Sequence, residues 1–357
     1  MQSSAFQFFT HTEETWTAML EALCGAKISV DIEHYIFLPD SLGQEFIKII
    51  RERNGAGVKV RLLLDTVGSY ALYNSSVPAQ LESEGIEIQF FNTVGFWRIP
   101  YFATWFFRDH KKMIIIDGKV GFTGGTGINK SMATWRDTDA KIEGPIVGEM
   151  LEIFEDMWKA KGDNIFQRIK KIRARTKKRF FITNIPYFRK RFLYYALIKA
   201  IKRSTKSIWL TTPYVIPDHK LSRVLRRASR RGVEVKIIVP KIIDVAVVGF
   251  ASNSSLGELL KAGVRIFKYQ PVILHAKTAI IDTEWATFGS FNLDSLSFVY
   301  NFEGNVVSTD SKCVGALSAH FAEDLKNCEE VLYKNWVHRP FLEKLKEFFI
   351  APIRGFL

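Results

Sequence analysis

Hydrophobic and polar positions divide the chain into two kinds of segment. Short apolar runs with many β-branched residues, as in 27–40 and 57–65, have the length and composition of strands. Segments between them, as in 42–57 and 220–232, place apolar residues on one face and end at a glycine, which is typical of amphipathic helices. Strands that alternate with helices predict parallel βαβ units, so we expect an α/β fold.

The same succession of segments occurs twice. KISVDIEHYIFLPD corresponds to KSIWLTTPYVIPD, and the glycine-led segments GVKVRLLLD and GIEIQFFN correspond to GVEVKIIVP and GVRIFKYQ. Repetition of whole strand and helix units indicates a duplicated fold. We therefore expect two half-domains, 1–159 and 193–333, related by pseudo-two-fold symmetry, each a mixed or parallel sheet flanked by helices, with the active site at their interface. A basic linker, 160–192, would join them, and an amphipathic tail, 334–357, would follow.

A fourth repeated block carries residues suited to phosphate chemistry. The segment HKKMIIID contains one His-x-Lys-x4-Asp triplet, and HAKTAIID contains the other. Residues i and i+2 of a strand face the same side, so each histidine and its lysine should point together. One such pair alone would usually be a half-exposed strand with a solvated lysine, but its duplication favours one site made from two half-sites. The candidate catalytic residues are His110, Lys112, Asp117, His275, Lys277 and Asp282.

These residue types suit attack on a phosphodiester without a metal ion. The anionic oxygens of a phosphodiester repel nucleophiles, so an enzyme needs a neutral nucleophile, cations on the oxygens and an acid for the leaving alcohol. A histidine pair can serve as nucleophile and acid, and two lysines can hold the oxygens. The chain has three cysteines and no Cys-x-x-Cys pair, which disfavours a zinc site or a disulfide framework. We expect neither metal nor cofactor.

Each histidine also needs an acceptor on its other ring nitrogen to fix its orientation. Asp139 lies 29 residues after His110, and Glu303 lies 28 residues after His275, so we predict that these two acids orient the histidines. The aspartates of the triplets should brace lysine or backbone. Ser290 and Asn292 are candidates for hydrogen bonds to the phosphate, or they form a turn.

The two halves differ most just before the first triplet. The first half has 25 residues from Gly85 to His110, whereas the second half has 12 from Gly263 to His275. The surplus is rich in aromatic residues, which either add to the core or contact a lipid interface. The apolar stripe of the tail likewise fits a docked helix or one that lies on a membrane. Our candidate membrane contacts are Phe96, Trp97, Tyr101, Phe102, Trp105 and Phe106.

The charge of the chain indicates an anionic partner. The net charge is +13 and the pI is near 9.5, which suits either nucleic acid or the surface of an acidic membrane. No run of 18 apolar residues and no signal peptide is present, so we expect peripheral contact with the cytoplasmic face of the cell membrane. The basic linker could bind headgroups or DNA phosphates. The oligomeric state does not follow from the sequence.

The paired triplets resemble those of the phospholipase D superfamily, in which each is commonly followed by Gly-Ser-x-Asn. The second half matches this pattern through Gly289, Ser290 and Asn292, whereas the first half has Gly-Gly-Thr-Gly from Gly124. DIEHYIFLPD, HKKMIIIDGKVGFTGGTGI and LKAGVRIFKYQPVILHAK are also similar to bacterial cardiolipin synthases that lack N-terminal membrane helices.

This resemblance implies exchange of a phosphodiester through a phosphohistidine, with phosphatidylglycerol as both donor and acceptor. It makes His110 the nucleophile and His275 the acid that releases glycerol, although pseudo-symmetry makes the roles interchangeable. Two other activities use the same site: hydrolysis of phospholipids, and cleavage of nucleic acid by a metal-independent nuclease. In the synthase, Lys112 and Lys277 would hold the phosphoryl oxygens, and Asp139 and Glu303 would orient the histidines.

Overall fold

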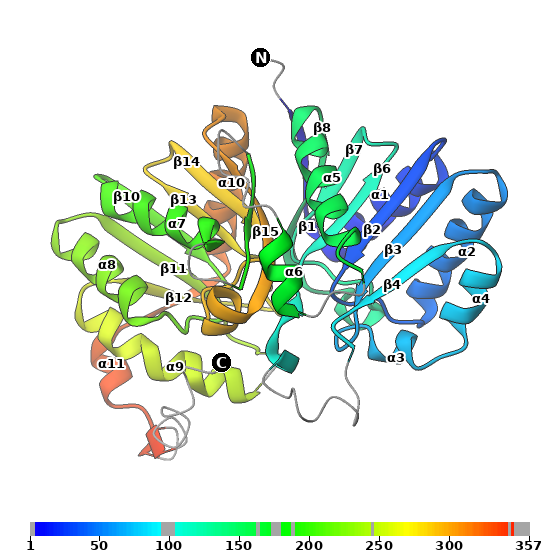
Figure 1. The fold of residues 1–357 in the computed structure, drawn as a ribbon. Helices are drawn as coiled ribbons and strands as arrows, with labels where there is room; N and C mark the ends of the chain where they lie inside the picture. The colour runs from blue at the N-terminus through cyan, green and yellow to red at the C-terminus, as the bar shows by residue number, and fades with distance from the viewer. Residues whose placement is uncertain are drawn as a thin grey trace.

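The computed structural model describes residues 4–93, 104–161, 165–172, 180–186, 190–243, 246–341 and 344–345. Two sheets stand side by side, and helices cover their outer faces and part of the space between them (Figure 1). This arrangement confirms the predicted α/β class with two similar halves. None of the helices within the described ranges is long and apolar enough to cross a bilayer.

The first sheet has seven strands in the order β1-β8-β7-β6-β2-β3-β4. Strands β2, β3 and β4 are parallel, and the others join by antiparallel pairing. Its strands are β1 (Ala5–His11), β2 (Ser29–His34), β3 (Lys59–Asp65), β4 (Glu87–Phe91), β6 (Lys112–Ile116), β7 (Val120–Thr123) and β8 (Arg136–Glu143).

The second sheet has nine strands in the order β16-β12-β11-β10-β13-β14-β15-β5, with β9 also paired to β15. Six of them repeat the order of the first sheet, and β9 takes the place of β1. Its strands are β5 (Arg108–Asp109), β9 (Phe181–Asn184), β10 (Ser207–Thr211), β11 (Glu234–Pro240), β12 (Arg265–Tyr269), β13 (Thr278–Ile281), β14 (Trp285–Gly289), β15 (Asn301–Ser308) and β16 (Cys328–Val331).

The helices follow the strands as the hydrophobic pattern predicts. The helices of the first half are α1 (Thr12–Cys24), α2 (Ser41–Gly55), α3 (Tyr70–Tyr73), α4 (Val77–Ser83), α5 (Pro145–Trp158) and α6 (Ile165–Lys171), with a 3-10 turn at Lys130–Met132. Those of the second half are α7 (Phe192–Arg203), α8 (His219–Arg230), α9 (Ala246–Lys261), α10 (Ser311–Lys326) and α11 (Tyr333–Val337), with a π-helical turn at Leu296–Tyr300.

The repeated sequence blocks contain matching helix signals. Asp40 accepts a hydrogen bond from the backbone N–H of Gly43 at the start of α2, and Asp218 accepts one from Leu221 at the start of α8. Each aspartate ends a repeated Pro-Asp pair and acts as the N-cap of its helix. The Pro-Asp pairs therefore fix where the two equivalent helices begin.

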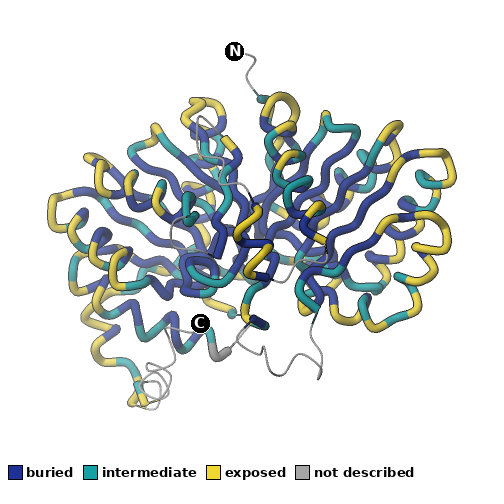
Figure 2. The backbone as a smooth tube through the Cα atoms, viewed as in Figure 1, coloured by how far each residue is buried: buried dark blue, intermediate teal, exposed yellow. Residues whose placement is uncertain are grey.

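Three apolar clusters form the core of the molecule. One lies under α1 and α2 in the first half, and a second lies under α7 and α8 in the second half. The third lies between the sheets and contains α5 and α10, which each pack on the inner face of their own sheet. Figure 2 shows this arrangement as buried strands inside exposed outer helices. The central cluster makes the two halves one folded unit.

The segment predicted as a linker forms structure of its own. It contributes α6 and β9, and β9 pairs antiparallel with β15 from Glu303 to Val306. The second repeat thus begins at β9, before residue 193. The strand Phe181–Asn184 was not predicted because it has only four residues and is surrounded by many lysines and arginines. Much of the basic segment, including 173–179 and 187–189, lies outside the described residues.

Candidate active site

The two histidines of the triplets meet where the sheets join. His110 lies between β5 and β6, and its backbone N–H donates to Phe302 O at 2.9 Å. His275 precedes β13, and its backbone N–H donates to Arg136 O at 2.8 Å. Each histidine is therefore anchored by a strand of the opposite half, β15 or β8. The predicted site between the halves depends on this exchange.

The ring of each histidine is also held by an acid from the opposite half. His110 Nδ1 lies 3.0 Å from Glu303 Oε1, and His275 Nδ1 lies 2.7 Å from Asp137 Oδ2. Burial raises the pKa of both acids, but their interactions with the neighbouring histidine and lysine outweigh it and lower the pKa. An ionised carboxylate can only accept, so each Nδ1 donates its proton. The other nitrogen, Nε2, then keeps its lone pair for chemistry.

Asp137, rather than the predicted Asp139, holds His275. The register explains the correction, because Thr123 pairs with Ala140 as Phe288 pairs with Val306. Asp137 and Glu303 each lie three residues before those partners and are therefore equivalent. Asp139 instead accepts hydrogen bonds from Thr126 and Thr15, and burial and the charge of Asp137 raise its pKa to about 7.

The sequence spacing misled because the halves differ in length between the glycine and the acid. The first half has 13 residues from Gly124 to Asp137, and the second has 14 from Gly289 to Glu303. The second half has a π-helical turn in this connection, whereas the first has a 3-10 turn. A π-helical turn commonly accommodates one additional residue. Matching the spacing from the histidines therefore selected the acid two residues too far along β8.

The lysines lie beside their histidines, as the strand spacing predicts. Lys112 Nζ donates to His110 O at 3.0 Å, and Lys277 Nζ donates to His275 O. Both side chains are buried. Burial and the charge of Lys277 lower the pKa of Lys112 to about 7. A phosphate between these cations would relieve their repulsion.

The same surroundings keep the histidines neutral. Burial lowers the pKa of His110, partly offset by Glu303. Burial and the charge of Lys277 lower the pKa of His275 to about 4. At pH 7 both rings are therefore uncharged in the free protein. A neutral imidazole with a free Nε2 is the form that can attack phosphorus.

Ser290 supports an acid rather than facing the phosphate. Its fully buried Oγ donates to Glu303 Oε2, which corrects its predicted role as a phosphate ligand. The first half has Gly125 at this position. A Cβ there would clash with Asp137 Oδ1, so the carboxylate fills the space of a side chain. The Gly-Gly departure from the superfamily pattern thus leaves the His275 partner in place.

A cavity of about 440 Å³ opens onto the histidines. Asn292, predicted as a phosphate contact, lines it, and its Oδ1 has no partner among the described residues. The Tyr35 ring lies 4.8 Å from the His110 ring, and the Trp135 ring lies 5.1 Å from the His275 ring. Asp294 also lines the cavity, and burial raises its pKa to about 7. The volume of the cavity is in the range of a small-molecule site.

Several of these cavity residues escaped sequence analysis. Tyr35 and Tyr214 lie just after β2 and β10, in the repeated blocks that contain these strands, and both line the cavity. Polar and aromatic residues just beyond the carboxyl ends of parallel strands commonly build ligand sites. That position was the available signal. Trp135 and Asp294 carried no such signal, because they lie in irregular connections.

The aspartates of the two triplets lie outside the cavity. Asp117 accepts hydrogen bonds from the backbone N–H groups of residues 27–29, and Asp282 accepts them from those of residues 205–207. Burial alone would raise the pKa of each, but these bonds lower it. Asp117 directly follows β6 and Asp282 directly follows β13, so each lies at the opposite end of its strand from the histidine. They brace backbone at the starts of β2 and β10, which is the bracing role predicted for them and separates them from the catalytic residues with which they were grouped.

The aromatic insertion is described only in part. Trp105 and Phe106 line the cavity, and Phe106 is 49% exposed. Phe96, Trp97, Tyr101 and Phe102 lie outside the described residues. Within the part of the chain that the structure describes, no group of three or more His, Cys, Asp or Glu side chains is placed to hold a metal ion.

Comparison with known proteins agrees with this architecture. The family model described as "Cardiolipin synthase, PLD-like domain" matches residues 19–158 and 197–325, one segment in each half. A probable cardiolipin synthase of Bacillus subtilis, YwiE, is 32% identical over 97% of this chain and 71% of its own length. The cardiolipin synthase of Geobacillus kaustophilus is 32% identical over 95% of this chain and 69% of its own length.

Solved structures support the fold independently of sequence. The phosphatidylserine synthase of Haemophilus influenzae superposes with a TM-score of 0.79 at 14% identity, covering 99% of this chain and 95% of that one. At this identity the likeness concerns the fold alone. With both halves matched by the family model and relatives at 32% identity, the chain belongs to the cardiolipin synthase family with phospholipase D-like domains.

Proposed function

We propose that the chain is a cardiolipin synthase that transfers a phosphatidyl group between two molecules of phosphatidylglycerol. The observation that carries the proposal is the pair of neutral histidines facing one cavity, each oriented by an acid of the opposite half. Family membership supports the phospholipid substrate and the transferase class.

In the first step, His110 Nε2 attacks the phosphorus of one phosphatidylglycerol. A P–N bond forms, and the bond from phosphorus to the headgroup glycerol oxygen breaks. His275, carrying a proton, gives it to that oxygen, and glycerol leaves. The anionic phosphodiester supplies the charge that raises the pKa of His275 toward neutrality, because it offsets the nearby lysines. Glu303 stabilises the charge that develops on His110.

In the second step, a hydroxyl of a second phosphatidylglycerol headgroup attacks the phosphorus. His275, now neutral, takes the hydroxyl proton, the P–N bond breaks, and cardiolipin is released. Lys112 and Lys277 hold the non-bridging oxygens in both steps. Asn292 Oδ1 can accept a further hydrogen bond from a hydroxyl of the glycerol headgroup. Water in place of the second lipid would give phosphatidic acid instead.

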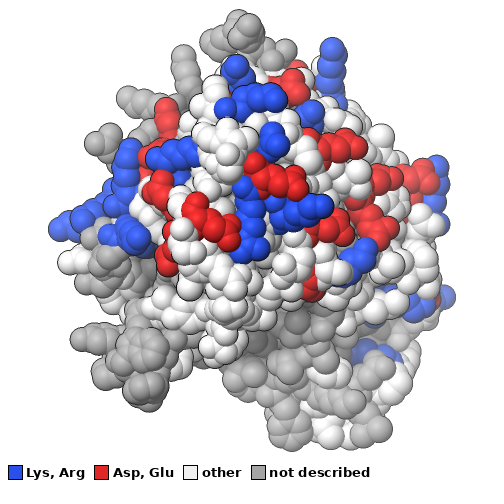
Figure 3. Space-filling model, turned by 90° about the vertical axis from the view of Figure 1, so that its right-hand side faces the viewer, with Lys and Arg blue, Asp and Glu red and all other residues white. Residues whose placement is uncertain are grey.

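Exposed apolar side chains around the cavity support contact with a membrane. Val67 lies two residues beyond β3 and is 44% exposed, and Ile242 lies two residues beyond β11 and is 49% exposed. Because β3 and β11 are equivalent strands, one such side chain lies in each half. Phe106 lines the cavity with Val67 and is exposed, and Tyr70, three residues after Val67, is exposed as well. In Figure 3 charged residues gather over the upper and middle part of this face, and uncharged residues lie below them.

We define Val67, Tyr70, Phe106 and Ile242 as the apolar rim. Such a rim would seat the cavity against the lipid surface, so that the phosphodiester reaches the histidines without leaving the interface. The chain would then act as a peripheral protein, and we place it on the cytoplasmic face of the cell membrane. Flotation with vesicles of phosphatidylglycerol tests the rim, because Val67→Asp/Ile242→Asp should weaken binding severalfold. Unchanged flotation would refute this orientation.

The product profile tests the proposed reaction. Purified protein is incubated with phosphatidylglycerol vesicles, and the lipids are identified by mass spectrometry. We expect cardiolipin and glycerol in equal amounts, and loss of both in His110→Ala and His275→Ala. Phosphatidic acid as the main product would show that the protein hydrolyses phosphatidylglycerol instead of transferring its phosphatidyl group. No product from the parent protein, or equal activity in the histidine variants, would refute the site.

A further inference from the structure

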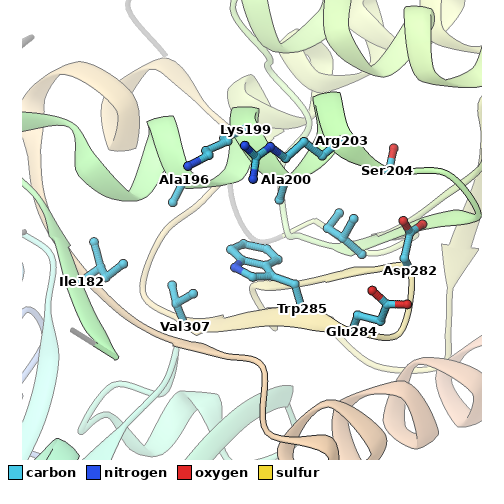
Figure 4. A pocket seen from close by; sticks show the side chains of 11 residues that line it. Ile182, Ala196, Lys199, Ala200, Arg203, Ser204, Asp282, Glu284, Trp285 and Val307 are labelled. Carbon is cyan, nitrogen blue, oxygen red and sulfur yellow. The ribbon is translucent and has the colours of Figure 1, made fainter. Parts of the chain in front are cut away.

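A second cavity lies on the outer side of the second half. Its volume is about 450 Å³, and it lies between α7, β9 and the turn that joins β13 to β14. Figure 4 shows Lys199 and Arg203 on the α7 side, facing Trp285 and Val307 of the sheet. It is separate from the active site, because Asp282 follows one end of β13 whereas Lys277 precedes the other.

The cavity combines cations with an apolar floor. Lys199 and Arg203 are one helical turn apart on the same face of α7, and neither has an ion pair or hydrogen-bond partner among the described residues. Like charges at this spacing repel each other. Ile182, Trp285 and Val307 form the apolar part of the lining. A bound anion would relieve the repulsion, and an apolar group attached to it would cover the floor.

Two acids at the edge of the cavity bond to groups other than these cations. Asp282 is occupied by the backbone N–H groups of residues 205–207, at 2.8 Å each. Glu284 faces Lys206, with 3.7 Å between Nζ and Oε1. The N–H donors of Lys199 and Arg203 are therefore not used by these acids and are open to a ligand.

The first half shows that the fold does not require these residues. Val30 pairs with Ile116 as Ile208 pairs with Ile281, so the positions of Lys199 and Arg203 correspond to Glu21 in α1 and Gly25 just after it. Trp285 corresponds to Val120, because Ile281 pairs with Trp285 as Ile116 pairs with Val120. The cations and the indole thus occur only in the second half.

The surrounding surface would attract an anion to this cavity. Helices α7 and α8 together carry eight Lys and Arg and no Asp or Glu, whereas α1 and α2 carry three Lys and Arg and five Glu. A surface of one sign raises the local concentration of oppositely charged ligands. Only the second half has this character.

We propose that this cavity binds an anionic phospholipid that is not being turned over. Lys199 and Arg203 would hold the headgroup phosphate, and Trp285 with Val307 and Ile182 would contact the glycerol and the first methylene groups. The protein would then hold one lipid at its catalytic cavity and another at this outer cavity. The binding of the outer lipid does not depend on the proposed reaction.

Equilibrium dialysis measures the number of lipids bound. The full-length His110→Ala/His275→Ala protein, which cannot turn lipid over, is dialysed against radiolabelled dihexanoyl-phosphatidylglycerol below its micelle concentration. Adding Lys199→Gln/Arg203→Gln should remove one bound lipid per chain. Lys202→Gln/Arg227→Gln changes the net charge equally on exposed positions of α7 and α8 outside the cavity, and should remove none. Equal binding by the two charge variants would overturn the proposal.

Two further arms identify the ligand. Inorganic phosphate should compete for this outer site at least tenfold more weakly than the lipid, because it lacks the apolar part. Trp285→Ala should weaken the affinity for the lipid severalfold and leave the affinity for inorganic phosphate unchanged. Equal competition by phosphate, or a Trp285→Ala protein that binds lipid normally, would make the cavity a site for small anions and overturn its assignment to lipid. A failure of the proposed reaction would leave these measurements unaffected, since both histidines are absent.

Discussion

The orienting acids offer a sharp contrast between two neighbouring aspartates of β8. Asp137 holds His275 Nδ1 at 2.7 Å, whereas Asp139, two residues away on the same strand, bonds to Thr126 and Thr15. Asp137→Asn keeps the size of the side chain but removes its charge, and the amide can present a donor to the imidazole. The ring then loses the partner that fixes its tautomer. We expect Asp137→Asn to slow the reaction and Asp139→Asn to change it little.

The magnitude follows from the hydrogen bond. A bond to a charged group contributes about 1.5–3 kcal/mol. Since about 1.36 kcal/mol corresponds to a factor of ten in rate, kcat should fall about 10- to 150-fold in Asp137→Asn. Asp139 already has a pKa raised to about 7, so it is partly neutral at pH 7 and its replacement by a neutral amide is a smaller change.

The assay is the initial rate of cardiolipin formation in mixed micelles of phosphatidylglycerol. Thermal unfolding by circular dichroism serves as the control for folding, because both aspartates are buried. Asp139→Asn is the matched variant, with the same chemical change on the same strand. A larger loss of kcat in Asp139→Asn than in Asp137→Asn, with both proteins folded, would refute the assignment.

Three further predictions concern pH and stability. Lys112 is charged below its pKa of about 7 and neutral above it, so kcat/KM should fall as the pH rises through this value in a pH–rate profile; a flat profile to pH 9 would contradict the role of Lys112. Asp117→Ala and Asp282→Ala each remove the acceptor of three backbone N–H groups. In urea unfolding, the free energy of unfolding should fall by about 1–3 kcal/mol while kcat stays near that of the parent. A loss of kcat without a loss of stability would make the two aspartates catalytic residues. Asp324→Ala leaves the buried Arg136 without its two-bonded partner, so unfolding should show a loss of about 3–5 kcal/mol; a loss under 1 kcal/mol would refute this estimate.

The repeat made most of the fold predictable. Apolar runs and helix-ending glycines indicated the βαβ units, and the equivalent blocks predicted two halves with one site between them. The Pro-Asp pairs and glycines function at the same structural positions in both halves, such as Gly57 and Gly232, whose φ angles are 85° and 89°. Local patterns of this kind are readable because each constrains only its own helix or strand.

The exchange between halves could not be read from the sequence. Glu303 was predicted as an orienting acid, but its partner His110 lies 193 residues away in the opposite half. Asp137 was missed because a one-residue difference in a turn changed the spacing by which the acids were compared. The role of Ser290 was misjudged for a related reason, since its hydroxyl is fully used by Glu303. These are consequences of long-range register, which local periodicity does not determine.

Trapping the covalent intermediate tests the central claim most directly. Protein that is turning over phosphatidylglycerol is quenched in alkali, digested and analysed by mass spectrometry for a phosphatidyl group on histidine. We predict this adduct on the peptide that contains His110, and its absence in His110→Ala. Cardiolipin formation by a His110→Ala/His275→Ala protein, or steady turnover without an adduct on either histidine, would contradict a phosphohistidine mechanism at this site.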